Sequence, residues 1–164
     1  MSLSSTSSTD TAPPSAQPRS GRLLTMVALS VAGIAISGYL TYVHLAHATP
    51  MCVVGAGCET VNASVYSAIA GVPVALLGLG LYGLLFILSL AALRGTESIS
   101  SWAVLGAFGL ALSGTLYSGY LTYIELFVLQ ALCAWCLTSA AIMTVIFALS
   151  TWTLLRPPGA SDRQ

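Results

Sequence analysis

The sequence of 164 residues contains no lysine, and only 6% of its residues are charged. Five arginines and five acidic residues give a formal net charge of zero. This scarcity of charge excludes an ordinary soluble domain, in which about a quarter of the residues are charged. In contrast, 56% of the residues are apolar, a composition typical of an integral membrane protein.

The N-terminal segment departs from this composition. Residues 1–20 are rich in Ser, Thr and Pro and have too little apolar surface to bury, so they are predicted to be a disordered tail. Apolar stretches follow at 23–45, 74–93, 102–128 and 133–155, each long enough to cross a hydrocarbon core of about 30 Å as a helix. Because backbone groups in lipid must be bonded internally, the sequence predicts an all-α domain over 21–156, a bundle of four transmembrane helices, followed by a tail at 157–164.

The arginines predict the orientation of this bundle. They precede the first helix, separate the second from the third, and follow the fourth (Arg19, Arg22, Arg94, Arg156 and Arg163). An even number of crossings places all of them on one side, which the positive-inside rule makes cytoplasmic, together with both termini. The outer face then holds the loop 46–71, in which a short interfacial helix over Ser64 to Ala70 is expected, and a tight turn at 129–132.

The first helix has an alternative interpretation. Arg19 and Arg22, the apolar run after them and Ala46-His47-Ala48 together imitate a signal peptide with a cleavage site. The run 23–45 is however longer than the usual apolar region of about 7–15 residues in a signal peptide. We therefore expect this helix to be retained.

All four cysteines fall at the predicted outer face. Cys52 and Cys58 lie in the loop with glycines between them, and Cys133-Ala134-Trp135-Cys136 forms a C-x-x-C at the start of the fourth helix. The outer face is the oxidising one, and a helix N-terminus lowers the pKa of a thiol. The pattern therefore indicates two redox-active pairs. Inert structural disulfides, or cysteines used simply as small buried apolar residues, are the alternatives.

A hexapeptide occurs twice. Ser37 to Tyr42 reads SGYLTY, as does Ser118 to Tyr123, and the same shift carries Cys52 onto Cys133. This indicates a parallel internal repeat in which the first two helices correspond to the last two. Independent use of tyrosines at the membrane interface would also produce the hexapeptides.

Other residues leave more than one interpretation open. His44 and His47 share a helical face and precede the loop cysteines, so a zinc or copper site in a metal-binding or metal-moving protein is an alternative function, although the spacing of Cys52 and Cys58 exceeds that of a usual zinc site. Interfacial histidines without a special role are the simpler interpretation, and we expect no metal. Glu125, the only acid inside a predicted membrane helix, is either a proton relay or a solvated interfacial group.

The two cysteine pairs indicate an electron-transfer function. A dithiol at the mouth of an apolar bundle is placed to react with a lipid-soluble molecule that accepts two electrons, and a quinone of the menaquinone or ubiquinone type fits. The loop pair is placed where a soluble protein can reach it. Thiol–disulfide exchange is the only chemistry needed to connect the two pairs.

Three segments carry a resemblance to a known family. They are Gly57-Cys58-Glu59-Thr60-Val61-Asn62-Ala63-Ser64-Val65-Tyr66-Ser67, Gly71-Val72-Pro73-Val74-Ala75-Leu76-Leu77-Gly78, and Cys133-Ala134-Trp135-Cys136. Together they resemble the bacterial branch of the vitamin K epoxide reductase family, over nearly the whole of 23–155. The resemblance implies a multi-pass enzyme of the bacterial plasma membrane that generates disulfides for the folding of exported proteins, reoxidises a thioredoxin-fold partner outside the membrane, and has no nucleic-acid partner.

The resemblance also implies residue roles. Cys52 would exchange with the partner, Cys58 would pass the disulfide to Cys133, and Cys136 would lie beside the quinone. Ser64 matches the family's loop serine, and it and Trp135 are candidates for quinone binding or loop support. Ala140 replaces a tyrosine of the animal enzymes, which argues against epoxide reduction. The chain ends soon after the fourth helix without a fused thioredoxin domain, so we expect the partner to be a separate protein.

Overall fold

The computed structural model describes residues 19–46, 48, 51, 57–69 and 71–155. Among them are four helices long and apolar enough to cross a membrane: α1 (Arg19–Leu45), α3 (Val74–Arg94), α4 (Glu97–Phe127) and α5 (Ala134–Leu155). The predicted four-helix membrane bundle is thereby confirmed. The expected tails at 1–20 and 157–164 lie outside the described residues, apart from Arg19 and Ser20, which are helical.

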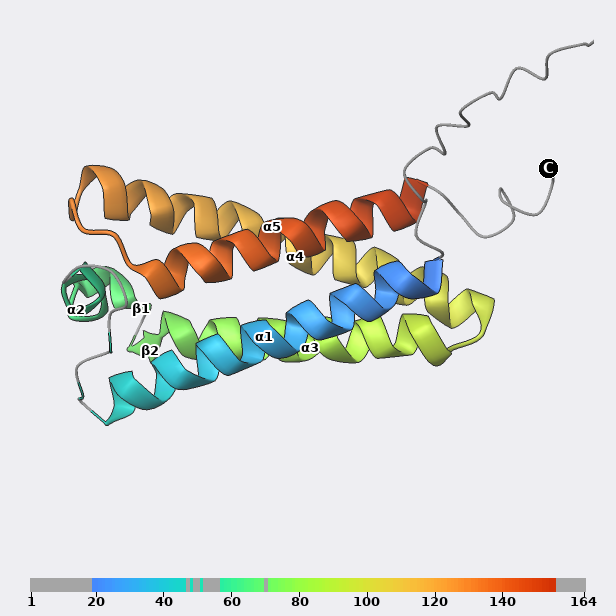
Figure 1. The fold of residues 1–164 in the computed structure, drawn as a ribbon, viewed down its shortest axis with the longest axis horizontal. Coiled ribbons are helices and arrows are strands. Elements are labelled where there is room, and N and C mark those ends of the chain that lie inside the picture. The colour runs from blue at the N-terminus through green and yellow to red at the C-terminus, as the bar shows by residue number, and fades with distance from the viewer. Residues whose placement is uncertain (1–18, 47, 49–50, 52–56, 70, 156–164) are drawn as a thin grey trace, which may run out of the picture.

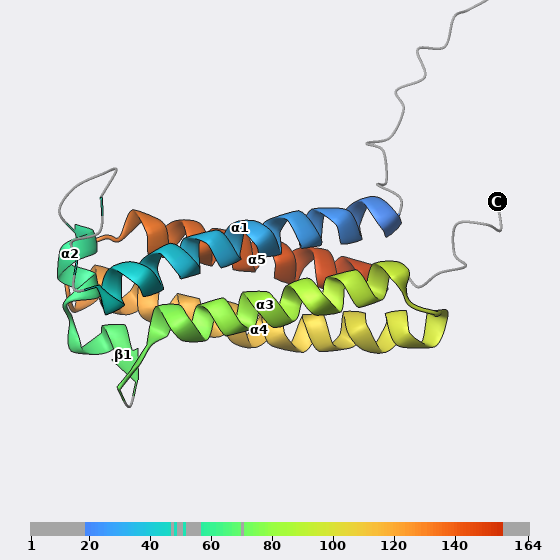
Figure 2. The same cartoon turned by 90° about the horizontal axis from the view of Figure 1, so that it is seen from below.

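The long helices pack side by side in a ring. α1 contacts α3 and α5, and α4 also contacts both of them. Figures 1 and 2 show that α1 begins and α5 ends at one end of the bundle, whereas the short elements between α1 and α3 cover the other end. We call the latter the loop end. α1 thus packs as one of the four long helices of the bundle.

The arginine end of the bundle is held by polar contacts between helices. Arg19 donates a hydrogen bond to the Ser100 hydroxyl at 2.9 Å, and Ser100 donates in turn to the carbonyl of Ala92 at 2.8 Å. These contacts explain why α4 begins at Glu97, five residues before the predicted start at 102. The polar first turn of α4 is stabilised by neighbouring helices outside the apolar stretch.

The distribution of side chains is that of a membrane bundle. Small polar residues are buried between the helices, among them Ser30, Ser89 and Ser150, while large apolar residues such as Ile87 and Trp102 are exposed on the outside. Lipid solvates apolar side chains as well as a protein core does, so helix contacts in membranes favour small residues that let backbones approach. At Gly33, a Cβ atom would overlap the ring of Tyr82, which shows how closely α1 and α3 pack.

The loop end differs from the prediction in its local structure. A short α-helix, α2, spans Gly57–Asn62, and only a 3-10 turn (Val65–Ser67) lies in the segment 64–70 that was expected to be helical. The segment then pairs as strand β1 (Ala68–Ile69) with β2 (Val72–Pro73). Gly71 has a φ of 82°, which glycine adopts without strain, so the chain can turn sharply there. The β-branched residues Ile69 and Val72, which favour strands, pair with each other across the turn. The hairpin therefore replaces the expected helix.

Candidate functional site

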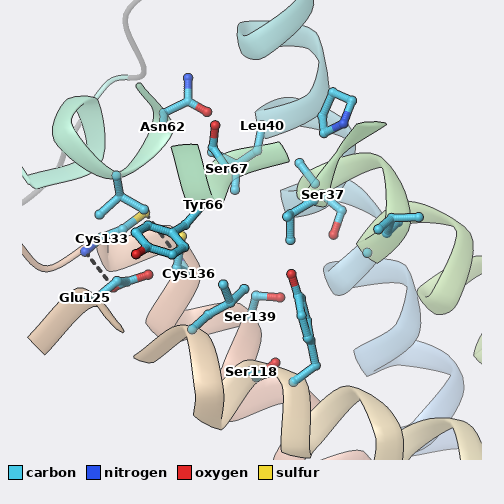
Figure 3. A pocket seen from close by; sticks show the side chains of 18 of the residues that line it. Ser37, Leu40, Asn62, Tyr66, Ser67, Ser118, Glu125, Cys133, Cys136 and Ser139 are labelled. Carbon is cyan, nitrogen blue, oxygen red and sulfur yellow. Dashed lines mark hydrogen bonds between the residues drawn. The ribbon is translucent and has the colours of Figure 1, made fainter. Parts of the chain in front are cut away.

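A cavity of about 490 Å³ lies between the helices at the loop end. Its lining is largely apolar, but the side chains of three cysteines reach it: Cys58 from α2, Cys133 from the turn before α5, and Cys136 from the first turn of α5. The volume falls within the usual range of about 300–1,000 Å³ for small-molecule sites. Figure 3 shows Cys133 and Cys136 side by side with Glu125 along this lining.

The geometry of the C-x-x-C follows from its place at a helix start. α5 begins at Ala134, so Cys133 occupies the N-cap position, and the backbone N–H of Cys136 donates to the Cys133 sulfur at 3.4 Å. Both cysteines are free thiols, and Cys133 is only 2% exposed. A thiolate at an N-cap is stabilised by the unpaired N–H groups of the first turn.

These contacts change the acidity of Cys133. A hydrogen bond from the Cys136 thiol, with further ones from the backbone N–H groups of Cys136 and Trp135, holds the pKa of Cys133 below its ordinary value, against the opposing effects of burial and of the Glu125 charge. Cys133 is therefore the thiol of the pair that ionises first. It is the natural nucleophile for disulfide exchange.

We expect a pH dependence that reflects this acidity. In the fully reduced protein, the rate of alkylation of Cys133 by iodoacetamide should rise with pH, with a midpoint below the pKa of about 8.5 of an ordinary cysteine, because the thiolate is the reactive form. Cys136→Ala removes the largest stabilising contact, so the profile should move to higher pH. Mass spectrometry of the Cys133 peptide measures this, and identical profiles for the two proteins would contradict the assignment.

Glu125 is brought to the C-x-x-C by the turn between α4 and α5. Its carboxylate oxygen Oε2 accepts a hydrogen bond of 3.1 Å from the backbone N–H of Cys133, and its side chain also interacts with that of Cys136. Gln130, with a φ of 50°, and the 3.0 Å bond from Ala131 N–H to the Glu125 carbonyl make the turn tight. Glu125 is 3% exposed, so the solvated interfacial acid considered from the sequence is not what the structure has.

Cys58 is buried against the same turn. It is 1% exposed and disulfide-bonded, whereas Cys52, its predicted partner in the outer pair, lies outside the described residues. α2 begins so close to the turn that a Cβ atom on Gly57 would overlap the carbonyl oxygen of Leu132 and lie 2.8 Å from its nitrogen. Leu132 directly precedes Cys133, so α2 is packed next to the inner thiols.

The two other residues predicted from the sequence hold the loop end in different ways. Ser64 lines the cavity, and its hydroxyl donates to the carbonyl of Val61 at 2.7 Å. Trp135 does not line the cavity. Its ring N–H donates a hydrogen bond to the carbonyl of Met51 at 2.9 Å, and the centroids of the Trp135 and Tyr39 rings are 5.4 Å apart. Trp135 therefore contacts the segment that leads into the outer loop.

Two polar contacts of the cavity were not foreseen from the sequence. The hydroxyl of Tyr82 donates to the carbonyl of Ser139 at 2.8 Å and lies 3.0 Å from its hydroxyl, which joins α3 to α5. Nδ1 of His44 lies 3.4 Å from Oδ1 of Asn62, and this contact joins α1 to α2. A lone tyrosine in an apolar helix and a histidine at a helix end give no signal of these partners, because both contacts are between segments distant in sequence.

The hexapeptide repeat has a counterpart in space. Its first and fourth residues, Ser37 and Leu40 in α1 and Ser118 and Leu121 in α4, all line the cavity. α1 and α4 are each flanked by α3 and α5, so the two copies face the cavity from opposite sides of the ring. This placement favours a true internal repeat over independent use of interface tyrosines.

The alternative of a metal site depends on residues that the structure covers only in part. Within the described ranges, no group of three or more His, Cys, Asp and Glu side chains is placed to hold a metal ion. His47 and Cys52 lie outside those ranges.

The comparison with known families agrees with the resemblance seen in the sequence. Residues 24–151 match the family model described as the vitamin K epoxide reductase family. The matched segment covers well over half of the chain and includes all four cysteines, Ser64 and Glu125.

Proposed function

Because this chain belongs to the vitamin K epoxide reductase family, whose members are oxidoreductases that use quinones, we propose that it generates disulfides by passing electrons from exported thiols to a membrane quinone. The coarser function, a multi-pass membrane thiol oxidoreductase, follows from the family and the four membrane helices. The observation that carries the finer proposal is that three cysteines line one largely apolar cavity of about 490 Å³. They are the buried Cys58 and the free thiols Cys133 and Cys136.

The proposed membrane orientation places the loop end outside. The arginines lie before α1, between α3 and α4, and after α5, which under the positive-inside rule makes that end cytoplasmic. The cysteines then lie at the outer face of a bacterial plasma membrane. For the direct source of electrons we propose a separate thioredoxin-fold protein that exchanges with Cys52 at that face.

The proposed path uses the two cysteine pairs in series. Cys52 exchanges with the partner, which leaves Cys52 and Cys58 reduced. The Cys58 thiolate then attacks the Cys133–Cys136 disulfide at Cys133, forms a mixed disulfide and releases Cys136 as a thiol. When Cys52 resolves the mixed disulfide, the outer pair is oxidised again and the inner pair holds both electrons.

The residues of the cavity fit a quinone. Its lining is mainly apolar, as a flat ring requires, and the hydroxyls of Tyr82 and Ser139 lie on it as hydrogen-bonding groups. Cys136 reaches the same lining from the first turn of α5. A quinone supplies an acceptor for two electrons, the number released when Cys133 and Cys136 form a disulfide.

Quinone reduction by the purified protein tests the proposal. With a reduced thioredoxin-fold protein as electron donor and menaquinone or ubiquinone analogues as acceptors, we expect absorbance changes that report quinol formation by the wild type and none above background with Cys133→Ala. Thr138→Ala, an exposed change on the same helix, is the matched control and should retain full activity. A wild type that is inactive with every quinone while its cysteines are reduced would overturn the proposal.

A further inference from the structure

Glu125 has a place in the cavity that the thiol relay alone does not explain. A carboxyl group that is 3% exposed is costly to bury, and the described arginines, Arg19, Arg22 and Arg94, all lie at the opposite end of the bundle. Its hydrogen bond from the Cys133 N–H uses only one of its two oxygens. A purely structural contact to a backbone N–H does not require an acid, because a neutral amide would accept the same bond.

The second contact of Glu125 indicates what the acid is for. Its side chain interacts with that of Cys136, and the Cys136 thiol also reaches the Cys133 sulfur. The Cys136 thiol therefore has two neighbours that can interact with its proton, the Cys133 sulfur and the Glu125 carboxyl group. Figure 3 shows the three side chains together on the cavity lining.

We propose that Glu125 is a catalytic general base that takes the proton of Cys136 when the inner disulfide forms and returns it to the reduced quinone. The proposal deepens the proposed function, on which the second half of the step rests. Acid–base groups positioned next to the reacting atom contribute typically about 100- to 10,000-fold to a rate.

The step balances in atoms and electrons. The reduced pair starts as the Cys133 thiolate and the Cys136 thiol. The S–H bond of Cys136 breaks, its proton moves to the Glu125 carboxylate, and the S–S bond forms as two electrons leave for the quinone. Quinol formation takes up two protons, of which Glu125 supplies one and water at the outer face supplies the other.

The remaining titratable groups of the cavity leave this role to Glu125. They come from every element around it: His44 on α1, Cys58 on α2, Tyr66 in the 3-10 turn, Tyr82 on α3, Tyr117 on α4, and Cys133 and Cys136. Among the described residues that line the cavity, Glu125 is the only carboxylic acid, and His44 interacts with Asn62. Within the described lining, no other carboxylate can accept a proton from Cys136 at neutral pH.

A reaction without quinone isolates the proton transfer. In a chain with Cys52 and Cys58 replaced by serine, dithiodipyridine should react in two phases, as Cys133 forms a mixed disulfide and Cys136 then displaces the second thiopyridine. Glu125→Gln keeps the hydrogen-bond acceptor for Cys133 but cannot accept a proton. We expect its first phase to be no slower than in the wild type, because loss of the Glu125 charge removes one effect that opposes ionisation of Cys133. Its second phase should be about 100-fold slower at neutral pH and should become faster as the pH rises, because hydroxide can then replace the missing base.

Two further variants make the result decisive. Glu125→Asp keeps the acid, so its second phase should stay within about tenfold of wild type, and it also serves if the Gln variant does not fold. Glu97→Gln, an equal loss of charge at an exposed site at the other end of the bundle, should change neither phase. Equal slowing of both phases in Glu125→Gln, or no slowing at all, would overturn the proposal.

The quinone assay then separates this inference from the proposed function. If the wild type reduces no quinone but the second phase still depends on Glu125, the proposed function fails and the assignment of Glu125 as the base for Cys136 stands. If the wild type reduces quinone and Glu125→Gln does so at the same rate, the role of Glu125 fails alone.

Discussion

Cys136→Ala should lower the rate of quinone reduction at least about 1,000-fold while leaving the bundle folded. Cys133 can then form no disulfide within the C-x-x-C, so the two electrons have no route to the quinone. The remaining Cys133 thiolate is still next to α2 and can attack the disulfide of Cys58. A mixed disulfide between Cys58 and Cys133 should therefore accumulate, and mass spectrometry of proteolytic peptides measures it directly.

The trapped intermediate distinguishes the proposed order of exchange from its alternatives. Cys133→Ala should be equally inactive but should trap no such species, because it lacks the attacking sulfur. Thr138→Ala should match wild type in both assays, since its side chain is exposed on the outside of α5. The path through Cys133 would be contradicted if the Cys136→Ala protein still reduced quinone, or if it formed no mixed disulfide between Cys58 and Cys133.

Gly57→Ala should impair the transfer between the two cysteine pairs. The added methyl group would overlap the backbone of Leu132, which cannot turn aside as a flexible side chain does. Overpacking of this kind costs about 1–3 kcal/mol, and relief requires α2 to move away from Cys133. We expect the rate of partner-driven quinone reduction to fall roughly tenfold or more. In the Cys136→Ala background, less of the mixed disulfide should be trapped.

Gly80→Ala provides the matched control for this substitution. Gly80 is an exposed glycine in α3, and a Cβ atom there would meet no atom within 4 Å. Its activity should equal that of wild type. Thermal unfolding in detergent should be compared for both variants. If Gly57→Ala transfers electrons at the wild-type rate, α2 does not need its close approach to Leu132, and Cys58 must reach Cys133 in another way.

Several features were predictable because local composition decides them. The four membrane helices follow from apolar length, and α1 ends at Leu45 and α3 begins at Val74 as predicted. The closeness of Cys133 and Cys136 follows from their spacing at a helix start. The helix predicted over 64–70 was wrong, because Gly71 permits a tight turn and the flanking residues Ile69 and Val72 pair as strands.

Glu125 shows where prediction from the sequence ends. The sequence places it two helical turns before Cys133 and left two interpretations open, a solvated acid or a proton relay. The choice depends on how the chain reverses between α4 and α5, and the left-handed residue Gln130 is part of that turn. The reversal directs the carboxyl group back to the N–H of Cys133, at 3.1 Å, and away from solvent.

The sequence by itself determined that this protein crosses a membrane, which end carries the arginines, and that its thiols gather at the other end, because hydropathy, charge and spacing are properties of segments. Only the tertiary structure decided what the thiols contact: the N-cap that acidifies Cys133, the buried acid beside Cys136, and the approach of Gly57 to Leu132. Such contacts arise when helices distant in sequence pack together. Hydrogen bonds and steric contacts act over only a few ångströms, so no pattern within one segment specifies them.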